Sequence, residues 1–329
     1  MILCFRKEQL FVHSFHYQLG KTRRDLAQLE AERLIVGTGA ELAAIGYRYS
    51  FGLDESETLL TLASGPLSEV LRDVVAPAAF VFQHCYAENA VLHYDPSERN
   101  IALRTRYFPG EIMRHLKLDH VPYSCSFASG CSGFMSLLGA ASGTLLSSSS
   151  DEGPIVCVMA DRMPPGVPYN MLEERILGSD HSSAFVVGRE ARGYQLLGLG
   201  YYSTTRTRVA FLEVVKRTVE MIQALARNLE LDLTTSNVTV HYPNIFPETW
   251  KMVTRYLRNP RVEHVLDGMA ERAHCMASDS VISLAKFHRG EEGRIHIAVN
   301  YGVGLHLAVC LLREKANNGS IGSDAAASI

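Results

Sequence analysis

Residues 128–134 read ASGCSGF, and this short stretch places a cysteine in an unusual setting. Cys131 lies between Gly130 and Gly133, so the backbone can turn sharply there and a substrate can approach it closely. An apolar run at helical spacing follows at once, which predicts that Cys131 stands at the N-terminus of a helix. Free N–H groups and partial positive charge at such a terminus favour a thiolate and can bind a developing oxyanion. A buried structural cysteine in a tight turn is the competing interpretation of the same residues.

A thiolate nucleophile needs a proton acceptor and a group that orients it, and the chain offers 13 histidines. His241 ends a predicted strand and opens the segment HYPN, which also contains Asn244. His274 precedes Asp279 by five residues at the start of a predicted helix, so the carboxylate could fold back and orient the imidazole. His181, in GSDHSSA, is a weaker candidate. Each of these histidines, taken alone, is more often a packed or surface residue.

Predicted strands and helices alternate along the chain on both sides of Cys131. The runs at 154–160 and 184–187 are continuously apolar, as is typical of strands covered on both faces. We expect further strands at 79–83, 123–127, 238–241, 295–299 and 305–312, and helices at 55–75, 110–118, 134–145, 209–229, 250–257 and 279–287. This alternation predicts an α/β fold with helices covering both faces of its sheets.

The second set of chemical residues follows Cys131 by more than a hundred positions, as expected of two fused α/β halves that share one site. We therefore predict an N-terminal half over residues 1–190 that carries the nucleophile. A C-terminal half over residues 191–316 would carry the histidine and the aspartate. Residues 317–329 are rich in glycine, serine and alanine, and we expect a disordered tail.

Composition excludes several classes of function. The chain has 329 residues, 47% hydrophobic and 20% charged, with a net charge of -3, so nothing indicates a nucleic-acid or anionic-membrane partner. No apolar run is long enough to cross a membrane, and the first residues lack the pattern of a signal peptide, which favours a cytoplasmic location. The seven cysteines are scattered singly without a CxxC pair, so we expect neither a metal site nor a disulfide framework.

Four segments together resemble ketoacyl-acyl-carrier-protein synthase III (KAS III) of the thiolase superfamily. GCSGF around Cys131 is similar to that family's ACAGF nucleophile motif, and ILGSDHSSAFVVG at 176–188 to its FGDGAGAAVV stretch. HYPN at 241–244 is similar to the HQAN motif that supplies a catalytic histidine, and NYGVG at 300–304 to the FGGG loop. The order and spacing of these segments match the family from about residue 10 to residue 314.

This resemblance implies a thiolase fold, five layers in the order α-β-α-β-α built from two similar halves. It implies a homodimer, with a heterodimer as the alternative, and no permanently bound cofactor. It also implies ping-pong chemistry, in which an acyl group passes from a thioester of coenzyme A or of an acyl carrier protein onto Cys131 and then to a second substrate.

One departure from the family pattern affects the expected reaction. Typical members carry an asparagine in a GNTSAAS segment that helps stabilise the enolate of a decarboxylating malonyl thioester, whereas residues 273–280 here read AHCMASDS. This arrangement resembles the KAS III-like acyltransferases of antibiotic and polyketide pathways. The resemblance makes Cys131 the nucleophile, His274 the base and Asp279 its orienter, with His241 as a second polar group in the pocket, and leaves open which histidine is the main base.

The same resemblance suggests which residues bind the substrate. The backbone N–H of Cys131 and one from the glycine loop would hold the oxyanion. The expected substrate-binding residues are Asn244, Gly302, Val303 and Gly304.

Three functions are therefore compared. The first is an acyltransferase that moves the acyl group to a hydroxyl, an amine or another acceptor. The second is a carbon–carbon bond-forming synthase that decarboxylates without the asparagine. The third is a non-catalytic subunit of a heteromeric synthase, which is disfavoured because the nucleophile is retained in a glycine-flanked motif.

Overall fold

The computed structural model describes residues 1–118, 120–127, 129–149, 151–171, 175–206, 209–266, 268–302 and 305–316. The predicted tail therefore lies outside the described residues. The strands are β1 (Ile2–Cys4), β2 (Phe11–Leu19), β3 (Thr22–Asp25), β4 (Tyr49–Gly52), β5 (Ala79–Gln83), β6 (Val91–Tyr94), β7 (Thr105–Tyr107), β8 (Tyr123–Ser126), β9 (Ile155–Asp161), β10 (Asn170–Met171), β11 (Ile176–Leu177), β12 (His181–Gly188), β13 (Tyr194–Ser203), β14 (Val238–His241), β15 (Val262–Val265), β16 (Ile295–Gly302) and β17 (His306–Glu314).

Helices lie between most of these strands. The α-helices are α1 (Leu26–Ala31), α2 (Gly39–Ile45), α3 (Leu59–Asp73), α4 (Ile101–Arg104), α5 (Phe108–His115), α6 (Gly133–Ser147), α7 (Phe211–Asn228), α8 (Pro247–Tyr256), α9 (Met269–Arg272) and α10 (Asp279–Phe287). Short 3₁₀ turns are η1 (Ala87–Ala90), η2 (Gly130–Ser132) and η3 (Met276–Ser278). Every strand and helix expected from the sequence is present, with ends shifted by a few residues.

The large sheet consists of two half-sheets of the same topology. Its order is β15-β14-β16-β17-β13-β2-β12-β9-β5-β8, and β1 pairs with β13. In one half, β8, β5 and β9 are parallel and β12 and β2 run antiparallel. In the other, β15, β14 and β16 are parallel and β17 and β13 run antiparallel. The two half-sheets pair with each other where Tyr194 and Gln195 lie opposite Val12 and Phe11, and the chain contains the two similar halves that the sequence predicts.

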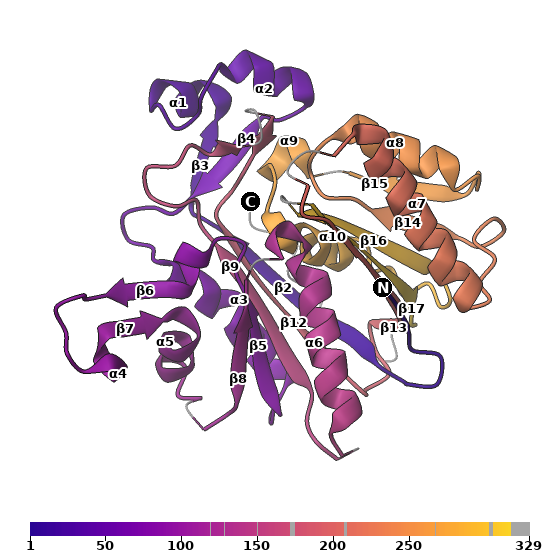
Figure 1. Ribbon diagram of the computed structural model, residues 1–329, viewed down its shortest axis with the longest axis horizontal. Coiled ribbons are helices and arrows are strands. Elements are labelled where there is room, and N and C mark those ends of the chain that lie inside the picture. The colour runs from indigo at the N-terminus through magenta and orange to yellow at the C-terminus, as the bar shows by residue number, and fades with distance from the viewer. Residues whose placement is uncertain are drawn as a thin grey trace.

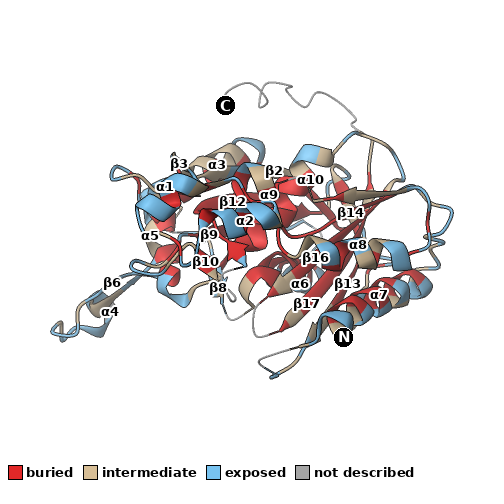
Figure 2. Cartoon of the chain, turned by 90° about the horizontal axis from the view of Figure 1, so that it is seen from above, coloured by how far each residue is buried: buried red, intermediate tan, exposed pale blue. Residues whose placement is uncertain are grey.

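Helices and half-sheets form five layers (Figure 1). One apolar cluster packs α3 and α5 on the outer face of the N-terminal half-sheet, and a second packs α7 and α8 on the outer face of the C-terminal one. The central cluster joins α6 and α10 to the inner faces of both half-sheets. Figure 2 shows this burial, with the central strands red and the outer faces of the peripheral helices exposed. The predicted thiolase fold is confirmed.

Alternation along the strands explains why each half-sheet is covered on both faces. In β9, Ile155, Cys157 and Met159 belong to the central cluster, whereas Val156 and Val158 belong to the outer one. Successive strand residues point to opposite faces, so a strand between two helical layers must be apolar at every position. This is why the sequence shows a continuous apolar run there.

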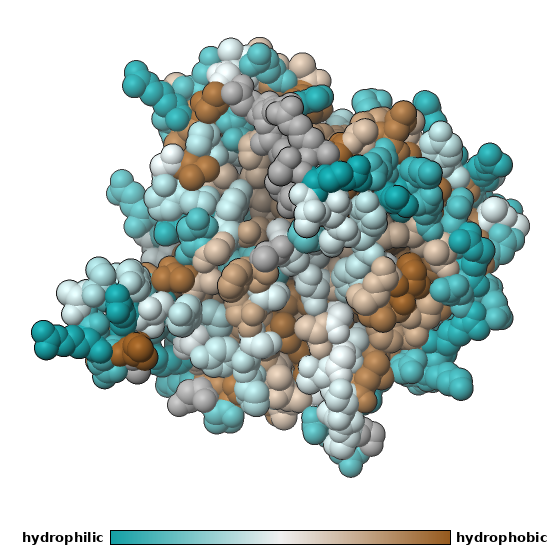
Figure 3. Space-filling view, viewed as in Figure 1, coloured by the Kyte–Doolittle hydropathy of each residue, from teal (hydrophilic) through white to brown (hydrophobic). Residues whose placement is uncertain are grey.

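Two peripheral units stand outside the layers. Strands β3 and β4 with helices α1 and α2 form a cap, and β6, α4 and β7 form an arm that projects from the N-terminal half (Figure 2). The arm exposes Tyr94, Ile101 and Tyr107, and hydrophobic patches lie among hydrophilic side chains across the face shown in Figure 3. No helix within the described residues is long and apolar enough to cross a membrane.

Candidate active site

The candidate site lies where the two central helices begin. Cys131 lies in the 3₁₀ turn η2, directly before α6, and His274 lies just before η3, which leads into α10. Helix α6 follows β8 in one half, and α10 follows β15 in the other, so the two turns occupy equivalent places in the repeated topology. The turns η2 and η3 are in contact, which brings residues from both halves to one point.

The backbone around Cys131 is fixed from several sides. Gly130 has a φ of 50°, which a side chain would disfavour. The Gln83 amide donates to the Gly130 carbonyl (3.1 Å), and the Asn300 amide donates to the Cys131 carbonyl (3.1 Å). Asn300 in turn accepts from the Ser280 hydroxyl of α10 (3.1 Å). Both halves therefore hold the turn that carries the nucleophile.

The glycine at the end of β16 lies against this turn. A Cβ atom on Gly302 would come within 2.7 Å of the Ser129 carbonyl oxygen and 3.4 Å of the Cys131 nitrogen. Gly302 thus adjoins the backbone that is predicted to hold an oxyanion. Val303 and Gly304, the other predicted loop residues, lie outside the described residues.

The Cys131 sulfur is surrounded by soft and polarisable groups. Its side chain is 6% exposed and packs with Met163 and Met276. The Met276 Sδ lies 3.8 Å from the Cys131 Sγ. The neighbouring Cys85 thiol, followed by the positive charge of His274, outweighs the effect of burial and lowers the pKa of Cys131 to about 5. These effects favour the thiolate form of Cys131 at neutral pH.

His274 is held between Asp279 and Cys131. Its Nδ1 lies 2.6 Å from Asp279 Oδ2, and its buried Nε2 makes no hydrogen bond of ordinary geometry within the described residues and faces the Cys131 thiol. Burial alone would lower the pKa of His274, but the charges of Asp279 and of the Cys131 thiolate outweigh it and raise that pKa. Both shifts favour a thiolate on Cys131 and an imidazolium on His274 as the resting pair.

The segment that carries His274 is anchored to the other half of the molecule. The His274 N–H donates to the Leu177 carbonyl (2.9 Å), and the Ser179 N–H donates to the His274 carbonyl (3.0 Å). Ala273 and Met276, on either side, have φ values of 56° and 45°, a region that residues with side chains rarely adopt. The unusual backbone is sustained by these contacts and sets the direction of the imidazole.

Asp279 is buried at the start of α10, where five groups satisfy its two oxygens. It accepts the His274 Nδ1 proton, the Cys275 N–H (3.1 Å), and both the backbone N–H (2.8 Å) and the side-chain amide (3.1 Å) of Asn244. The Arg272 guanidinium lies 3.7 Å away. Burial would raise the pKa of Asp279, but the charge of His274, followed by that of Arg272 and these hydrogen bonds, lowers it, so the carboxylate stays ionised.

Asn244 takes a different place from the one expected. It was predicted to bind substrate, but its side chain and backbone N–H bond Asp279, its amide also donates to the Ala273 carbonyl (2.9 Å), and its own carbonyl accepts from the Tyr47 hydroxyl (2.9 Å). With 1% of its surface exposed, Asn244 stands behind the catalytic candidates and positions the carboxylate.

His241 is not brought together with Cys131, which corrects the expectation that it contributes a second polar group to the pocket. Its Nδ1 lies 2.7 Å from the Ser283 hydroxyl and its Nε2 lies 2.8 Å from His296 Nδ1, while His296 Nε2 lies 2.9 Å from Glu314. Burial, followed by the neighbouring His296, lowers the pKa of His241 far below its ordinary value. Both ring nitrogens are thus used in a separate buried network.

His181, the weaker histidine candidate, forms a hydrogen bond with the backbone and not with the Cys131 thiol. The Nδ1 of His181 lies 2.9 Å from the Ser179 carbonyl oxygen. Sequence reasoning missed Cys85, which follows β5 and packs beside Cys131. No motif marks Cys85, because only the parallel pairing of β5 with β8 and β9 brings its loop to the start of α6.

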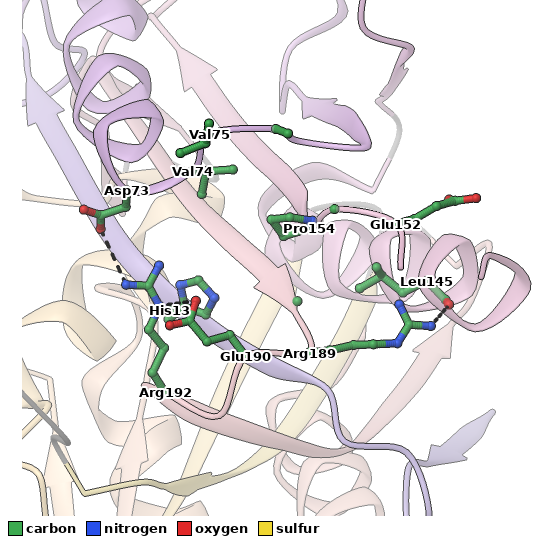
Figure 4. Close-up of a pocket in the computed structure, with 13 residues that line it drawn as sticks. His13, Asp73, Val74, Val75, Leu145, Glu152, Pro154, Arg189, Glu190 and Arg192 are labelled. Atoms are coloured by element: carbon green, nitrogen blue, oxygen red, sulfur yellow. Dashed lines mark hydrogen bonds and ion pairs between the residues drawn. The ribbon is translucent and has the colours of Figure 1, made fainter. Parts of the chain in front are cut away.

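A cavity of about 260 Å³ lies elsewhere in the molecule (Figure 4). It is lined by residues such as His13, Asp73 and Arg192 and reaches Leu145, at the opposite end of α6 from Cys131. The cavity therefore does not belong to the candidate site. Within the described residues, no group of three or more His, Cys, Asp or Glu side chains is placed to hold a metal ion.

The overall architecture is that of KAS III-like proteins of the thiolase superfamily. A synthase, 3-oxoacyl-(acyl-carrier-protein) synthase III from Aquifex aeolicus, is 16% identical, with a TM-score of 0.71, covering 92% of this chain and 99% of its own. The acyltransferase ChlB3 is 15% identical, with a TM-score of 0.74 and coverage of 94% and 98%. OleA from Xanthomonas campestris is 12% identical, with a TM-score of 0.70 and coverage of 94% and 99%.

No protein-family model matches the sequence, and neither does any curated protein. At identities this low the likeness establishes the fold, and the reaction must be argued from the site itself.

Proposed function

We propose that the chain is a KAS III-like acyltransferase that works through an acyl-enzyme on Cys131. The observation that carries this proposal is the buried row Cys131–His274–Asp279, in which the carboxylate lies 2.6 Å from the imidazole and the imidazole faces the thiol. A thiolate, a base and a group that orients the base are the parts that nucleophilic acyl transfer requires.

In the first half-reaction, the Cys131 thiolate attacks the carbonyl carbon of an acyl thioester. The new carbon–sulfur bond forms as the carbonyl electrons move to oxygen, and N–H groups at the start of α6 would stabilise that oxyanion. When the oxyanion collapses, the carbon–sulfur bond to the donor breaks. The departing thiolate takes the proton from the His274 imidazolium, leaving acyl-Cys131 and a neutral imidazole.

The second half-reaction uses this neutral imidazole as a base. Acylation removes the thiolate charge, one of the two charges that raise the pKa of His274, so the ring holds its proton less tightly in the acyl-enzyme. It can then take a proton from an acceptor hydroxyl or amine that attacks the thioester, and Asp279 stabilises the imidazolium that forms again. Loading the acyl group thereby prepares His274 for the next step.

The position of His241 favours transfer over decarboxylative condensation. Condensing members of the family that the sequence resembles use an HQAN histidine and an asparagine to stabilise an enolate. Here both ring nitrogens of His241 are bonded to Ser283 and His296, and the segment that would hold the asparagine reads AHCMASDS at residues 273–280. Within the described residues, no histidine and asparagine side chains lie together at the Cys131 thiol in the way that enolate stabilisation would require.

We further propose that the donor is a thioester of coenzyme A or of an acyl carrier protein, and that the protein works as a homodimer. Strand β8 supports the second proposal, because it is an edge of the sheet and all but the last of its four residues are exposed. An unpaired edge offers N–H and C=O groups to another strand. Pairing of two β8 strands would continue the sheet from one copy into the next.

Intact-protein mass spectrometry after brief incubation with acyl and malonyl thioesters tests the proposed function. We expect a mass gain equal to the acyl group in the wild-type protein and in Cys4→Ala, but none in Cys131→Ala. Adding candidate alcohols and amines should release the acyl group from the wild-type protein and not from His274→Ala.

Each contrary result points to another function. Loss of carbon dioxide from a loaded malonyl group would replace the proposal with a condensing synthase. A folded protein that no donor acylates would indicate a non-catalytic subunit.

A further inference from the structure

Cys85 lies beside the nucleophile although the two cysteines are 46 positions apart in the sequence. It belongs to the same small cluster as Cys131 and Met276. The Gln83 side-chain amide links Cys85 to the turn that carries Cys131, because its Nε2 lies 3.1 Å from the Gly130 carbonyl oxygen and 3.7 Å from the Cys85 sulfur. Gln83 is itself fully buried, so the bridge belongs to the packed interior.

The loop that carries Cys85 is held rigidly. The Cys85 N–H donates to both oxygens of Asp161 (2.9 Å each), and the same carboxylate accepts from the Tyr86 N–H (3.2 Å) and the Asn89 amide (2.8 Å). Asp161 ends β9, the neighbour of β5 in the sheet. The Cys85 thiol is thus presented to Cys131 by two adjacent strands rather than by a mobile loop.

We propose that Cys85 is a second thiol of the nucleophilic site, which donates its S–H to the Cys131 sulfur and stabilises the thiolate. The GCSGF motif contains Cys131 alone, so it assigns no role to Cys85. This proposal depends on the proposed function in one respect, which is that Cys131 is the nucleophile. A neutral donor suits this place, because a second cation would compete with His274 and a second anion would repel the thiolate.

The protonation states of the two thiols agree with this arrangement. Burial, followed by the hydrogen bond and the charge of Cys131, raises the pKa of Cys85 far above that of an ordinary thiol, so Cys85 keeps its proton. Cys85 is also the first of the neighbours that lower the pKa of Cys131. Of the two thiols, Cys131 is therefore the one that ionises, and Cys85 keeps the proton that it would donate.

The stabilised thiolate has a kinetic consequence. A lower pKa gives more thiolate at neutral pH but makes each thiolate a weaker nucleophile. Removal of the Cys85 donor should slow the reactions of Cys131 most at low pH, where the thiolate fraction falls about tenfold for each unit that the pKa rises. At high pH the same change should leave the rate unchanged or increase it.

The test is the pKa of Cys131 in the full-length protein, measured without any acyl substrate. The ultraviolet absorbance of the thiolate is titrated in the wild-type protein, and the titration of Cys131→Ala is subtracted. The same difference is measured in the Cys85→Ala and Cys85→Ser backgrounds, and in Cys4→Ala as the control, since Cys4 is also a half-buried cysteine. Thermal unfolding verifies that each variant is folded.

We expect Cys85→Ala to raise the pKa of Cys131 by at least one unit from about 5, so that iodoacetamide alkylates it about twofold or more slowly at pH 6 and about tenfold more slowly per unit at pH values below the pKa. Cys85→Ser, which keeps an O–H donor, should recover part of the shift, and Cys4→Ala should show none. An unchanged titration in a folded Cys85→Ala would overturn the proposal, as would equal shifts in the alanine and serine variants. If both Cys85 variants fail to fold, Cys85 is a packing residue and the proposal is equally wrong.

This result is separable from that of the proposed function. A shifted thiol titration in a protein that accepts no acyl donor would retain the role of Cys85 and reject acyl transfer. Efficient acylation of Cys131 with an unchanged thiol titration in Cys85→Ala would retain acyl transfer and reject the role of Cys85.

Discussion

At the scale of single residues, the site depends on charges that stabilise one another inside the protein. Neither the Cys131 thiolate nor the His274 imidazolium would be stable alone at such burial, because water is excluded from both. Together with the Asp279 carboxylate and the nearby Arg272 they alternate in sign. Removing one member therefore changes the protonation of the others, which makes the pH dependence of the site informative.

The depressed pKa of Cys131 gives a first prediction. Because the folded protein favours the thiolate, alkylation of Cys131 should stay nearly constant from pH 9 to pH 6, whereas the reaction of a cysteine in an unstructured model peptide, with a pKa of about 8.5, falls about 240-fold over that range. Peptide mapping after timed iodoacetamide treatment measures the rate. A Cys131 profile that parallels the free thiol would show that no ion pair forms.

Asp279 gives a second prediction at this scale. Asp279→Asn removes the charge that raises the pKa of His274 but keeps a side chain of similar size. We expect transfer to an acceptor to slow by about 10²–10⁴-fold, the usual contribution of acid–base catalysis. Single-turnover release of a preloaded acyl group measures this step. The matched change His241→Asn should lower the melting temperature but leave release within a few-fold of wild type, and a reversed ranking would make His241 the base.

At the scale of elements, the starts of α6 and α10 and the end of β16 form one packed junction. Gly302 allows β16 to approach the Cys131 turn, and Asn300, two residues earlier on the same strand, bonds the Cys131 carbonyl. The turn is therefore held in place by a strand of the other half. Substitutions on β16 should therefore shift the turn that carries Cys131 and slow its acylation, although they leave Cys131, His274 and Asp279 unchanged.

Gly302→Ala tests this junction. The new Cβ would lie 2.7 Å from the Ser129 carbonyl oxygen, so backbone must shift, and we expect a loss of about 1–3 kcal/mol in unfolding free energy together with slower acylation. Gly143→Ala on α6 is the control, because its Cβ meets nothing within 4 Å and alanine should stabilise the helix by about 0.5–1 kcal/mol. Chemical denaturation measures both variants. Equal stabilities would mean that β16 does not press on the turn.

At the scale of the whole molecule, the repeated topology explains why the site forms once. Each half supplies one central helix with a 3₁₀ turn at its start, but only the N-terminal turn carries the cysteine and only the C-terminal segment carries the histidine and the aspartate. The two turns meet in the central layer. Folding of both halves is therefore required before the site can exist.

Association through β8 is the prediction at this scale. Light scattering should give twice the 36.4 kDa mass of the chain. Cys125 lies within β8 and is exposed, so antiparallel pairing about a twofold axis would bring the two Cys125 side chains near each other. Mild oxidation should then crosslink the dimer through Cys125 and not in Cys125→Ser. A monomeric mass at micromolar concentration, or crosslinks that persist in that variant, would contradict pairing through this edge.

The sequence alone determined much of this protein. Apolar runs such as residues 154–160 identified strands covered on both faces, helical periodicity located α3, α6, α7 and α10, and the glycine-flanked Cys131 indicated a reactive thiol at a helix start. These features depend on local spacing, which the chain carries directly. The five-residue interval between His274 and Asp279 also placed their side chains together, because both lie within one turn and the helix start that follows it.

Only the tertiary structure decided which groups meet across the fold. Strands β2 and β13 were not predicted, since residues such as His13, His16, Gly198 and Gly200 interrupt their apolar pattern, yet they join the two half-sheets. Contacts between chain segments also placed His241 in a separate network, Asn244 behind Asp279, and Cys85 beside Cys131. The physical reason is that strand order and register set these distances, and neither is encoded in the local spacing of residues.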